Sequence, residues 1–351
     1  MQTKFQPSYN FNQLSSTALS EDKLLPLRNE KKVDVKGERY IVECKISESH
    51  YLKEYLAFDT KTRRKVLMKR YHEMGEGIPQ EAVRQITALQ SLGDTSNIQQ
   101  IVDIYTREKE LILVFEHFEV TLDSIFQNET YYKINEHLAR VYAFQILKAL
   151  QSLHQNKITH NNICLRSFYV GNTGSLILGK FEKCSLSYVS SQTENEQLVS
   201  TISERFQTIE CNSLAPELIL GQTYPTFASD IWAAGCLIFH FLTGYHPFNE
   251  STMISKLFRI FKTLGTPTMN LLDYPSLTLL PQFSDNYEKF PVWNPMPIEE
   301  LLPNCSDECK NFVLQMLQIE PTRRMSAKNL LKHKFMSSIN ETVLSESLNQ
   351  K

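Results

Sequence analysis

Apolar and polar positions follow two different patterns along this chain of 351 residues. In the first third, short apolar runs rich in β-branched residues end at charged or polar turns. Their length and composition predict the strands of an antiparallel sheet. The runs are RYIVECKI (39–46), EYLAFDT (54–60), KVLMKRY (65–71), IQQIVDIYT (98–106) and ELILVFEHF (110–118).

One segment among these runs has a helical period instead. In the segment 78–92, Val83, Ile86 and Leu89 recur at helical spacing, and Pro79 lies near the first turn, a position that proline favours. The sequence therefore predicts a single helix within the strand-rich part of the chain.

Helical patterns dominate from Thr121 onward. The clearest spans 139–155, where an apolar face runs through Val141, Phe144, Leu147 and Leu150. Strands with one helix, followed mainly by helices, predict an α+β fold with two lobes. The smaller lobe would hold the antiparallel sheet and its one helix, and the larger lobe would be helical.

The same patterns suggest domain boundaries. Residues 1–36 are mixed polar with little periodicity, and residues 337–351 are again polar, so we expect a tail at each end. The remaining residues, 37–336, would form one domain, with the small lobe at about 37–117 and the helical lobe at about 118–336.

Composition and charge are those of an ordinary soluble protein, with 42% apolar residues, 22% charged residues and a net charge of -2. Because there is no basic excess, nothing points to nucleic-acid binding. The N-terminus has no apolar core for a signal peptide, and the longest apolar stretch, 231–244, is too short to span a bilayer. We therefore expect an intracellular protein, cytoplasmic or nuclear, that is not bound to a membrane.

Seven cysteines are scattered along the chain. Cys305 and Cys309 are four positions apart, but no second cysteine pair or histidine cluster lies near them in the sequence. We expect reduced, buried thiols here and no metal site.

Several motifs, in their order along the chain, resemble those of a protein kinase domain. The resemblance covers roughly residues 36–336. It rests on VLMK (66–69) for the V-A-I-K strand, VFEH (114–117) for the hinge, HNNICLRS (160–167) for the catalytic loop, LAPEL (214–218) for A-P-E, SDIWAAGC (229–236) for the following helix and PTRRMSAKNLLKHKF (321–335) for the closing arginine segment. Two stretches, IPQEAVRQI (78–86) and LFRIFKTLGTP (257–267), are similar to the cyclin-dependent kinase branch.

The positions that carry phosphoryl-transfer chemistry in that family are degenerate here. Asn162 replaces the catalytic aspartate, and an amide is not a base at neutral pH; losing a general base costs ~10²–10⁴-fold in rate. Cys164 replaces the lysine that steadies the transferred phosphate, and Ser167 replaces a metal-binding asparagine. Lys180 replaces the D-F-G aspartate, so an ammonium would repel the Mg²⁺ that a carboxylate should hold.

The nucleotide-binding positions are also altered. The segment 47–54 has lost all three glycines of the phosphate loop, and Leu67 replaces the small residue that packs on the adenine face. Lys69 survives as the one candidate nucleotide contact. Its usual glutamate partner aligns with Gln85, which cannot form an ion pair.

Lys180 has two alternative interpretations. It could replace the charge of the metal and allow nucleotide binding without Mg²⁺, or it could pair with Glu48, Glu54 or Glu182 and close the pocket. We expect closure. Glu182 could also offer a displaced carboxylate to a metal, but it lies two positions from the usual site.

By contrast, the residues that serve a structural role in the family are kept. The resemblance implies that His160 and Phe181 stack in an apolar spine and that Asp230 braces the catalytic loop. It also implies that Glu217 and Arg324 form a buried ion pair. The regulatory positions are changed: Asn161 replaces the arginine that receives an activating phosphate, and an ungapped alignment puts Arg205 at the phosphorylated threonine.

The resemblance therefore implies a pseudokinase that serves as a protein-binding or regulatory scaffold. We expect no cofactor. We expect a protein partner on the helix 78–92, where Ile78, Pro79 and Arg84 remain, and a cyclin-like protein is one candidate. One alternative is a divergent but active serine/threonine kinase that uses ATP and Mg²⁺. Another is a sensor that binds ATP without transferring phosphate, against which Leu67 argues.

Overall fold

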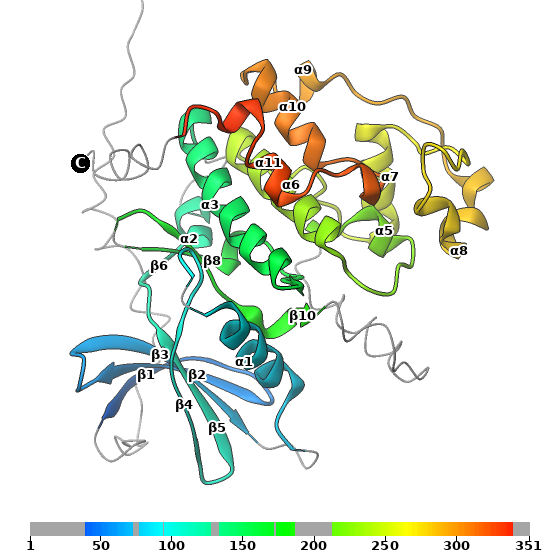
Figure 1. The fold of residues 1–351 in the computed structure, drawn as a ribbon. Helices are drawn as coiled ribbons and strands as arrows, with labels where there is room; N and C mark the ends of the chain where they lie inside the picture. Colours follow the sequence, from blue (N-terminus) through cyan, green and yellow to red (C-terminus); the bar gives the residue numbers. More distant parts are fainter. Residues whose placement is uncertain are drawn as a thin grey trace, which may run out of the picture.

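The computed structural model describes residues 39–72, 77–93, 95–127, 133–171, 173–186 and 213–339. The tail expected at residues 1–36, and all but the first three residues of the tail expected at 337–351, lie outside these ranges. Within them the chain forms a sheet lobe and a helical lobe (Figure 1). The expected two-lobed α+β architecture is confirmed.

The smaller lobe contains one antiparallel sheet of five strands in the order β1-β2-β3-β5-β4. Each predicted run forms one of these strands, with ends shifted by a few residues. The strands are β1 (Tyr40–Glu48), β2 (Leu52–Asp59), β3 (Arg64–His72), β4 (Ile101–Arg107) and β5 (Glu110–Glu116).

Side chains of β3 alternate between the two faces of this sheet, as the pleat requires. Val66 and Met68 join a small apolar cluster on the outer face. Leu67, Lys69 and Tyr71 are on the other face, and Leu67 and Tyr71 belong to the main core that continues into the helical lobe. The strand therefore places one lysine among apolar neighbours, where its charge must find a partner.

The helix predicted at 78–92 is α1 (Gln80–Leu92), so Ile78 and Pro79 precede it. Of the three apolar residues at helical spacing, Leu89 is buried and Ile86 packs against the main core, whereas Val83 is 49% exposed. The buried positions of the helix are Ala82, Gln85, Ala88, Leu89 and Leu92.

Helices make up most of the larger lobe, together with short strands that lie near the junction of the lobes (Figure 1). The strands are β6 (Val120–Thr121), β7 (Ile158–Thr159), β8 (Phe168–Val170), β9 (Leu176–Leu178) and β10 (Ser185–Leu186). The helices are α2 (Leu122–Gln127), α3 (Glu136–Gln155), α5 (Pro216–Ile219), α6 (Phe227–Thr243), α7 (Met253–Leu264), α8 (Pro281–Ser284), α9 (Ile298–Leu301), α10 (Asp307–Met316) and α11 (Ala327–Leu330).

The long helix α3 contains the apolar face expected at 139–155. Val141, Leu147 and Leu150 are buried, and Phe144 is partly buried. The apolar stretch 231–244 lies largely in α6, which is buried along most of its length. In the part of the chain that the structure describes, no helix is long and apolar enough to cross a membrane.

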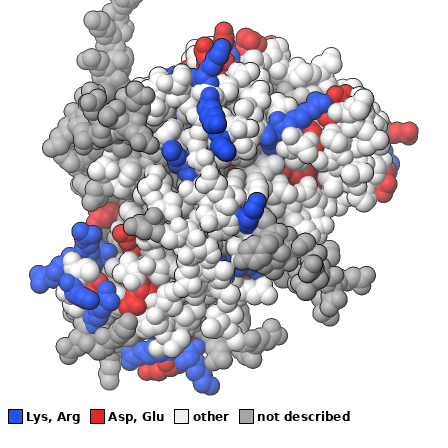
Figure 2. Space-filling view, viewed as in Figure 1, with Lys and Arg blue, Asp and Glu red and all other residues white. Residues whose placement is uncertain are grey.

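Charged side chains on the face shown in Figure 2 lie in small groups separated by wide uncharged areas. Acidic and basic residues are mixed in several of these groups. Among the described residues, this face has no continuous basic stripe of the kind that tracks a phosphate backbone.

A buried ion pair joins α5 to the segment before α11. Two nitrogens of the Arg324 guanidinium donate to the two carboxylate oxygens of Glu217 at 2.7 and 2.6 Å, and both side chains are fully buried. Arg324 also donates to the backbone carbonyls of Gln318 and Ala228. The pair thus ties three segments of the helical lobe together.

Replacing one member of this pair should destabilise the domain strongly, because the other charge is left buried without its partner. We expect Arg324→Ala or Glu217→Gln to lower the free energy of unfolding by ~3–5 kcal/mol. The neighbouring Arg323 is a matched control, since it pairs with Asp273 at an exposed site. Arg323→Ala should cost less than ~1 kcal/mol in urea unfolding, and equal losses for Arg323 and Arg324 would contradict the prediction.

Candidate functional site: the cleft between the lobes

The residues expected at a nucleotide site come together between the two lobes. Lys69 on β3 and Glu54 on β2 come from the sheet, and the segment 114–117 ends β5 and leads into the helical lobe. From the other side come β8 and the turn Phe181–Lys183, on which α1 also packs.

Lys69 is the centre of an ionic cluster in this cleft. Its side chain is only 1% exposed, and its ammonium is hydrogen-bonded to the Glu182 carboxylate. The Glu54 carboxylate lies 3.8 Å from the same nitrogen. Burial disfavours the charged form of Lys69, but these two carboxylates outweigh it and raise the pKa of Lys69 above its ordinary value. Lys69 is therefore a charged residue whose charge is balanced within the chain.

Gln85 of α1 completes the surroundings of the ammonium. Its side-chain oxygen lies 3.4 Å from the Lys69 nitrogen, and its amide nitrogen donates to the Tyr71 hydroxyl at 2.9 Å. Gln85 thus lies where the sequence alignment placed it, and it contributes a neutral acceptor. The negative charge that Lys69 requires comes from Glu182, on a different element.

The expectation that Lys180 pairs with a glutamate and closes the cleft is wrong, because Lys69 forms these pairs instead. Among the described residues, Lys180 forms no ion pair with Glu48, Glu54 or Glu182. Lys69 takes Glu54 and Glu182, whereas Glu48 pairs with Lys45 at 2.7 Å and Lys53 at 3.4 Å. Lys180 contributes only a weaker effect, since its charge helps to lower the pKa of Glu182.

The catalytic-loop backbone is held by Asp230 at the start of α6. Its two carboxylate oxygens accept the backbone N–H groups of His160 and Asn161 at 2.8 and 2.9 Å. The His160 imidazole lies 2.9 Å from the Gly179 carbonyl oxygen and packs edge-on against Phe181, with ring centroids 5.0 Å apart. These contacts fix the position of the catalytic loop relative to the turn at 181–183.

Asn161 fixes the segment after this turn by neutral hydrogen bonds. Its amide nitrogen donates to the Lys183 carbonyl at 2.9 Å and to the Ser185 hydroxyl at 3.0 Å. The Ser185 hydroxyl also bonds to Thr159 across the β7–β10 pair. Arg205, the residue expected at the activation position, lies outside the described residues.

The side chains at the former chemical positions bond mainly to one another. The Ser167 hydroxyl donates to the backbone carbonyl of Asn162 and lies 3.3 Å from the Cys164 sulfur. Ser167 is fully buried. The residues at the phosphate and metal positions are therefore turned into the loop itself, and none of these side chains provides a carboxylate.

An aromatic residue in the cleft was missed by the sequence reasoning. Tyr169 on β8 is 9% exposed, and its ring stacks on Phe118 with centroids 5.6 Å apart. Burial raises the pKa of Tyr169 to about 12, and the charges of Lys69, Glu54 and Glu182 all act on its hydroxyl. The uncharged ring of Tyr169 thus lies between Phe118, which follows the hinge, and the ionic cluster around Lys69. The sequence did contain a signal for this, since a large aromatic residue, Tyr169, follows closely after the catalytic loop.

Gly179 allows the close approach of this ring. A Cβ at residue 179 would lie 2.4 Å from a ring carbon of Tyr169 and 2.8 Å from the side-chain oxygen of Gln99. The amide nitrogen of the buried Gln99 donates in turn to the backbone carbonyl of Glu116 in the hinge, at 3.0 Å. A polar group of the hinge that borders the cleft is therefore satisfied from inside the chain.

A family model for the protein kinase domain matches residues 40–336. The chain belongs to the protein kinase family. The matched range includes every element of the cleft. Membership of this family explains the order of motifs along the chain.

A magnesium-bound nucleotide in this cleft would need carboxylate ligands for the metal and space for the adenine ring. An ammonium, Lys180, stands where a carboxylate ligand is required, and Ser167 is bonded within the loop. The two nearby carboxylates, Glu54 and Glu182, both pair with Lys69. Leu67 and Tyr169 are both buried in the cleft. The residues at this place therefore do not fit a magnesium-bound nucleotide.

The Lys69–Glu182 pair should make the stability of the domain sensitive to acid. Burial alone would raise the pKa of Glu182, but the charge and hydrogen bond of Lys69 lower it below its ordinary value of 4.5. A carboxylate with a depressed pKa in the folded state stabilises the fold above its unfolded pKa, and this contribution is lost as pH falls through the folded value.

We therefore expect Glu182→Gln to lower the unfolding free energy at pH 7 by ~1–3 kcal/mol, because one charged hydrogen bond is lost. We also expect a smaller loss of stability than in the wild type when pH falls below about 4.5. Urea unfolding at several pH values measures both effects. Glu119→Gln, a change at an exposed carboxylate 3.6 Å from Lys65, serves as control, and identical pH profiles for wild type and Glu182→Gln would refute the prediction.

Proposed function

We propose that this kinase domain is a pseudokinase related to cyclin-dependent kinases, and that it acts as a protein-binding or regulatory scaffold. The observation that carries the proposal is the ion pair between the buried Lys69 and the partly buried Glu182. This one interaction engages both Lys69, the candidate nucleotide contact, and Glu182, the displaced carboxylate considered as a metal ligand. ATP and Mg²⁺ are not cofactors of the domain in this proposal.

The absence of a base supports the same conclusion. Asn162 cannot accept the proton of a substrate hydroxyl. Asn161, whose amide donates to Lys183 and Ser185, offers no positive charge at the position that receives an activating phosphate in the family. An active divergent kinase would require Glu182 to leave Lys69 and bind Mg²⁺ beside the positive charge of Lys180. A metal-free ATP sensor would require Tyr169 to leave the cleft.

The test is thermal unfolding with ATP, first without metal and then with Mg²⁺. We expect no change in Tm for the wild type in either condition and no phosphate transfer to peptides, with Lys69→Ala as the background. A ligand at ~100 times its Kd would add ~2.7 kcal/mol, which is a shift of a few degrees. A shift with Mg²⁺ together with transfer that Lys69→Ala abolishes would support the active kinase instead, and a shift without metal would support the sensor.

The filled cleft can be tested by removing bulk from it. The double variant Leu67→Ala, Tyr169→Leu should bind adenine nucleotides measurably where the wild type does not, because space and the stacked ring are both removed. Phe118 remains as an aromatic surface in this variant. Isothermal calorimetry measures binding, and Tyr105→Leu, an aromatic substitution on β4, is the control. If nucleotide binds the wild type and the double variant equally, the cleft is not blocked by these side chains.

We propose that the partner is a protein that docks on α1 and the residues before it, with a cyclin-like protein as the candidate. Ile78 and Val83 are 52% and 49% exposed, so two large apolar side chains face solvent there. Arg84 is positioned along the helix by a hydrogen bond to Gln80 at 2.6 Å. The buried face of α1 rests on the turn at 181–183, so a partner on this helix would also act on the cleft.

Introducing a negative charge on this surface should weaken docking and leave the fold intact. With purified cyclin-fold proteins from the same source as probes, we expect Ile78→Glu and Val83→Glu to weaken binding at least ~10-fold, since each buries a charge in an apolar contact. Val102→Glu, an exposed apolar position on β4, is the matched control. Undiminished binding by both α1 variants would place the interface elsewhere.

A further inference from the structure

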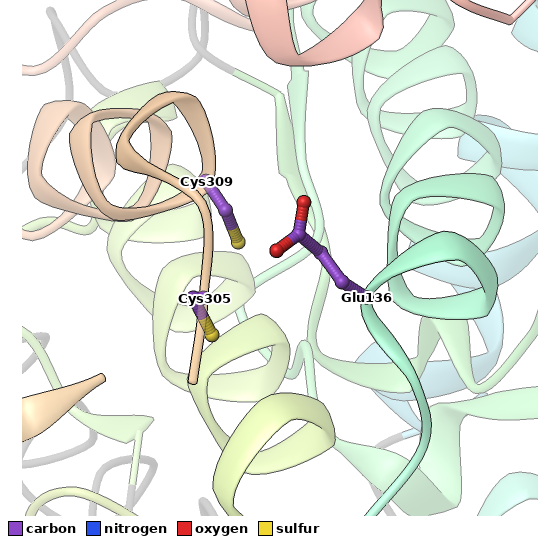
Figure 3. A group of neighbouring side chains, drawn as sticks. All are labelled: Glu136, Cys305 and Cys309. Carbon is purple, nitrogen blue, oxygen red and sulfur yellow. The ribbon is translucent and has the colours of Figure 1, made fainter. Parts of the chain in front are cut away.

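A second group of reactive side chains lies in the helical lobe, away from the cleft. Glu136 is the first residue of α3, Cys309 lies in the first turn of α10, and Cys305 precedes that helix. Figure 3 shows the carboxylate pointing across the gap between the two segments toward both sulfur atoms. A carboxylate oxygen and the two sulfurs all lie within 4.8 Å of one another.

The carboxylate is held in this orientation by its own hydrogen bonds. Oε2 of Glu136 accepts the backbone N–H of Ser306 at 2.8 Å, and Oε1 accepts the Ser306 hydroxyl at 2.8 Å and the Arg140 guanidinium at 3.1 Å. A carboxylate oxygen has two lone pairs, so Oε2 retains one of them. Supporting bonds of this type are what orient a ligating carboxylate in metal sites.

The two thiols differ in their access to solvent. Cys309 is fully buried, whereas Cys305 is only partly buried and gives a route into the cluster.

We propose that Glu136, Cys305 and Cys309 form a binding site for a thiophilic divalent cation such as Zn²⁺, with a water molecule as the fourth ligand on the Cys305 side. Two thiolates and one carboxylate match the ligand preference of Zn²⁺, whereas Mg²⁺ and Ca²⁺ require oxygen ligands throughout. With Zn–S bonds of about 2.3 Å, tetrahedral geometry needs donors ~3.8 Å apart, so the sulfurs must approach by ~1 Å at most. The protons on the two thiols are released to solvent on binding.

Sequence spacing had argued against this site, because no third ligand was visible near the two cysteines. The third ligand comes from α3, about 170 positions earlier in the chain. The bound ion would fasten the start of α3 to the start of α10. The site is independent of the function proposed for the cleft.

The first test is a titration of the reduced full-length protein with Co²⁺, which reports thiolate ligands through sulfur-to-metal charge-transfer absorption. We expect one equivalent to bind and Zn²⁺ to displace it. Cys309→Ser should abolish the charge-transfer band, and Glu136→Gln should weaken binding at least ~10-fold. Cys44→Ser, at a cysteine on β1 outside the cluster, should leave the titration unchanged.

A second test uses only the wild type, so it decides the matter even if a variant fails to fold. Zn²⁺ at one equivalent should slow the alkylation of Cys305 by iodoacetamide at least ~10-fold, measured by peptide mass spectrometry. Three outcomes would overturn the proposal: no charge-transfer band although the thiols are reduced, a band that survives Cys309→Ser or Glu136→Gln unchanged, or equal alkylation with and without Zn²⁺.

Discussion

A charged ammonium cannot remain in an apolar interior without an anionic partner, and this constraint organises the cleft of the domain. The alternation of β3 puts Lys69 among buried neighbours, and the chain itself supplies the counter-charges, Glu182 and Glu54. Because Glu182 belongs to the turn on which α1 rests, the same pair links the sheet lobe, the helix and the helical lobe. The resulting closed arrangement needs no ligand to balance its charge.

Around this pair, the contacts that stabilise the kinase fold are present, whereas the side chains at the positions used for phosphate transfer are replaced. Asp230 holds the loop backbone, His160 packs on Phe181, and the Glu217–Arg324 pair anchors α5. All of these contacts act between protein groups only. The side chains that would act on a substrate have become amides, hydroxyls or cations, and several of them bond within their own loop. A fold maintained for its shape is consistent with a scaffold.

Two surfaces outside the cleft extend this interpretation. Val83 on the outer side of α1 and Ile78 just before the helix are exposed, whereas the inner side of α1 packs on the core. A partner on this helix would therefore meet a rigid support. The group of Glu136, Cys305 and Cys309 lies in the other lobe and joins two helices whose starts are close in space. The domain thus has a candidate contact surface in one lobe and a candidate stabilising site in the other.

The sequence by itself determined the elements and the family. Short β-branched runs, one helical period and a fixed order of motifs predicted the two lobes. The residue types at positions 162, 167 and 180 predicted that the usual base and metal ligands are replaced. These features are local, so they can be read along the chain. The tertiary structure alone decided which charges pair. Glu182 lies 113 positions from Lys69, and spacing could not tell that it, and not Lys180, would enter this pair. The exposure of Val83 on α1, the packing of Tyr169 against Phe118 and the approach of Glu136 to the cysteines have the same origin. Each depends on distances between elements that come together only in the folded chain.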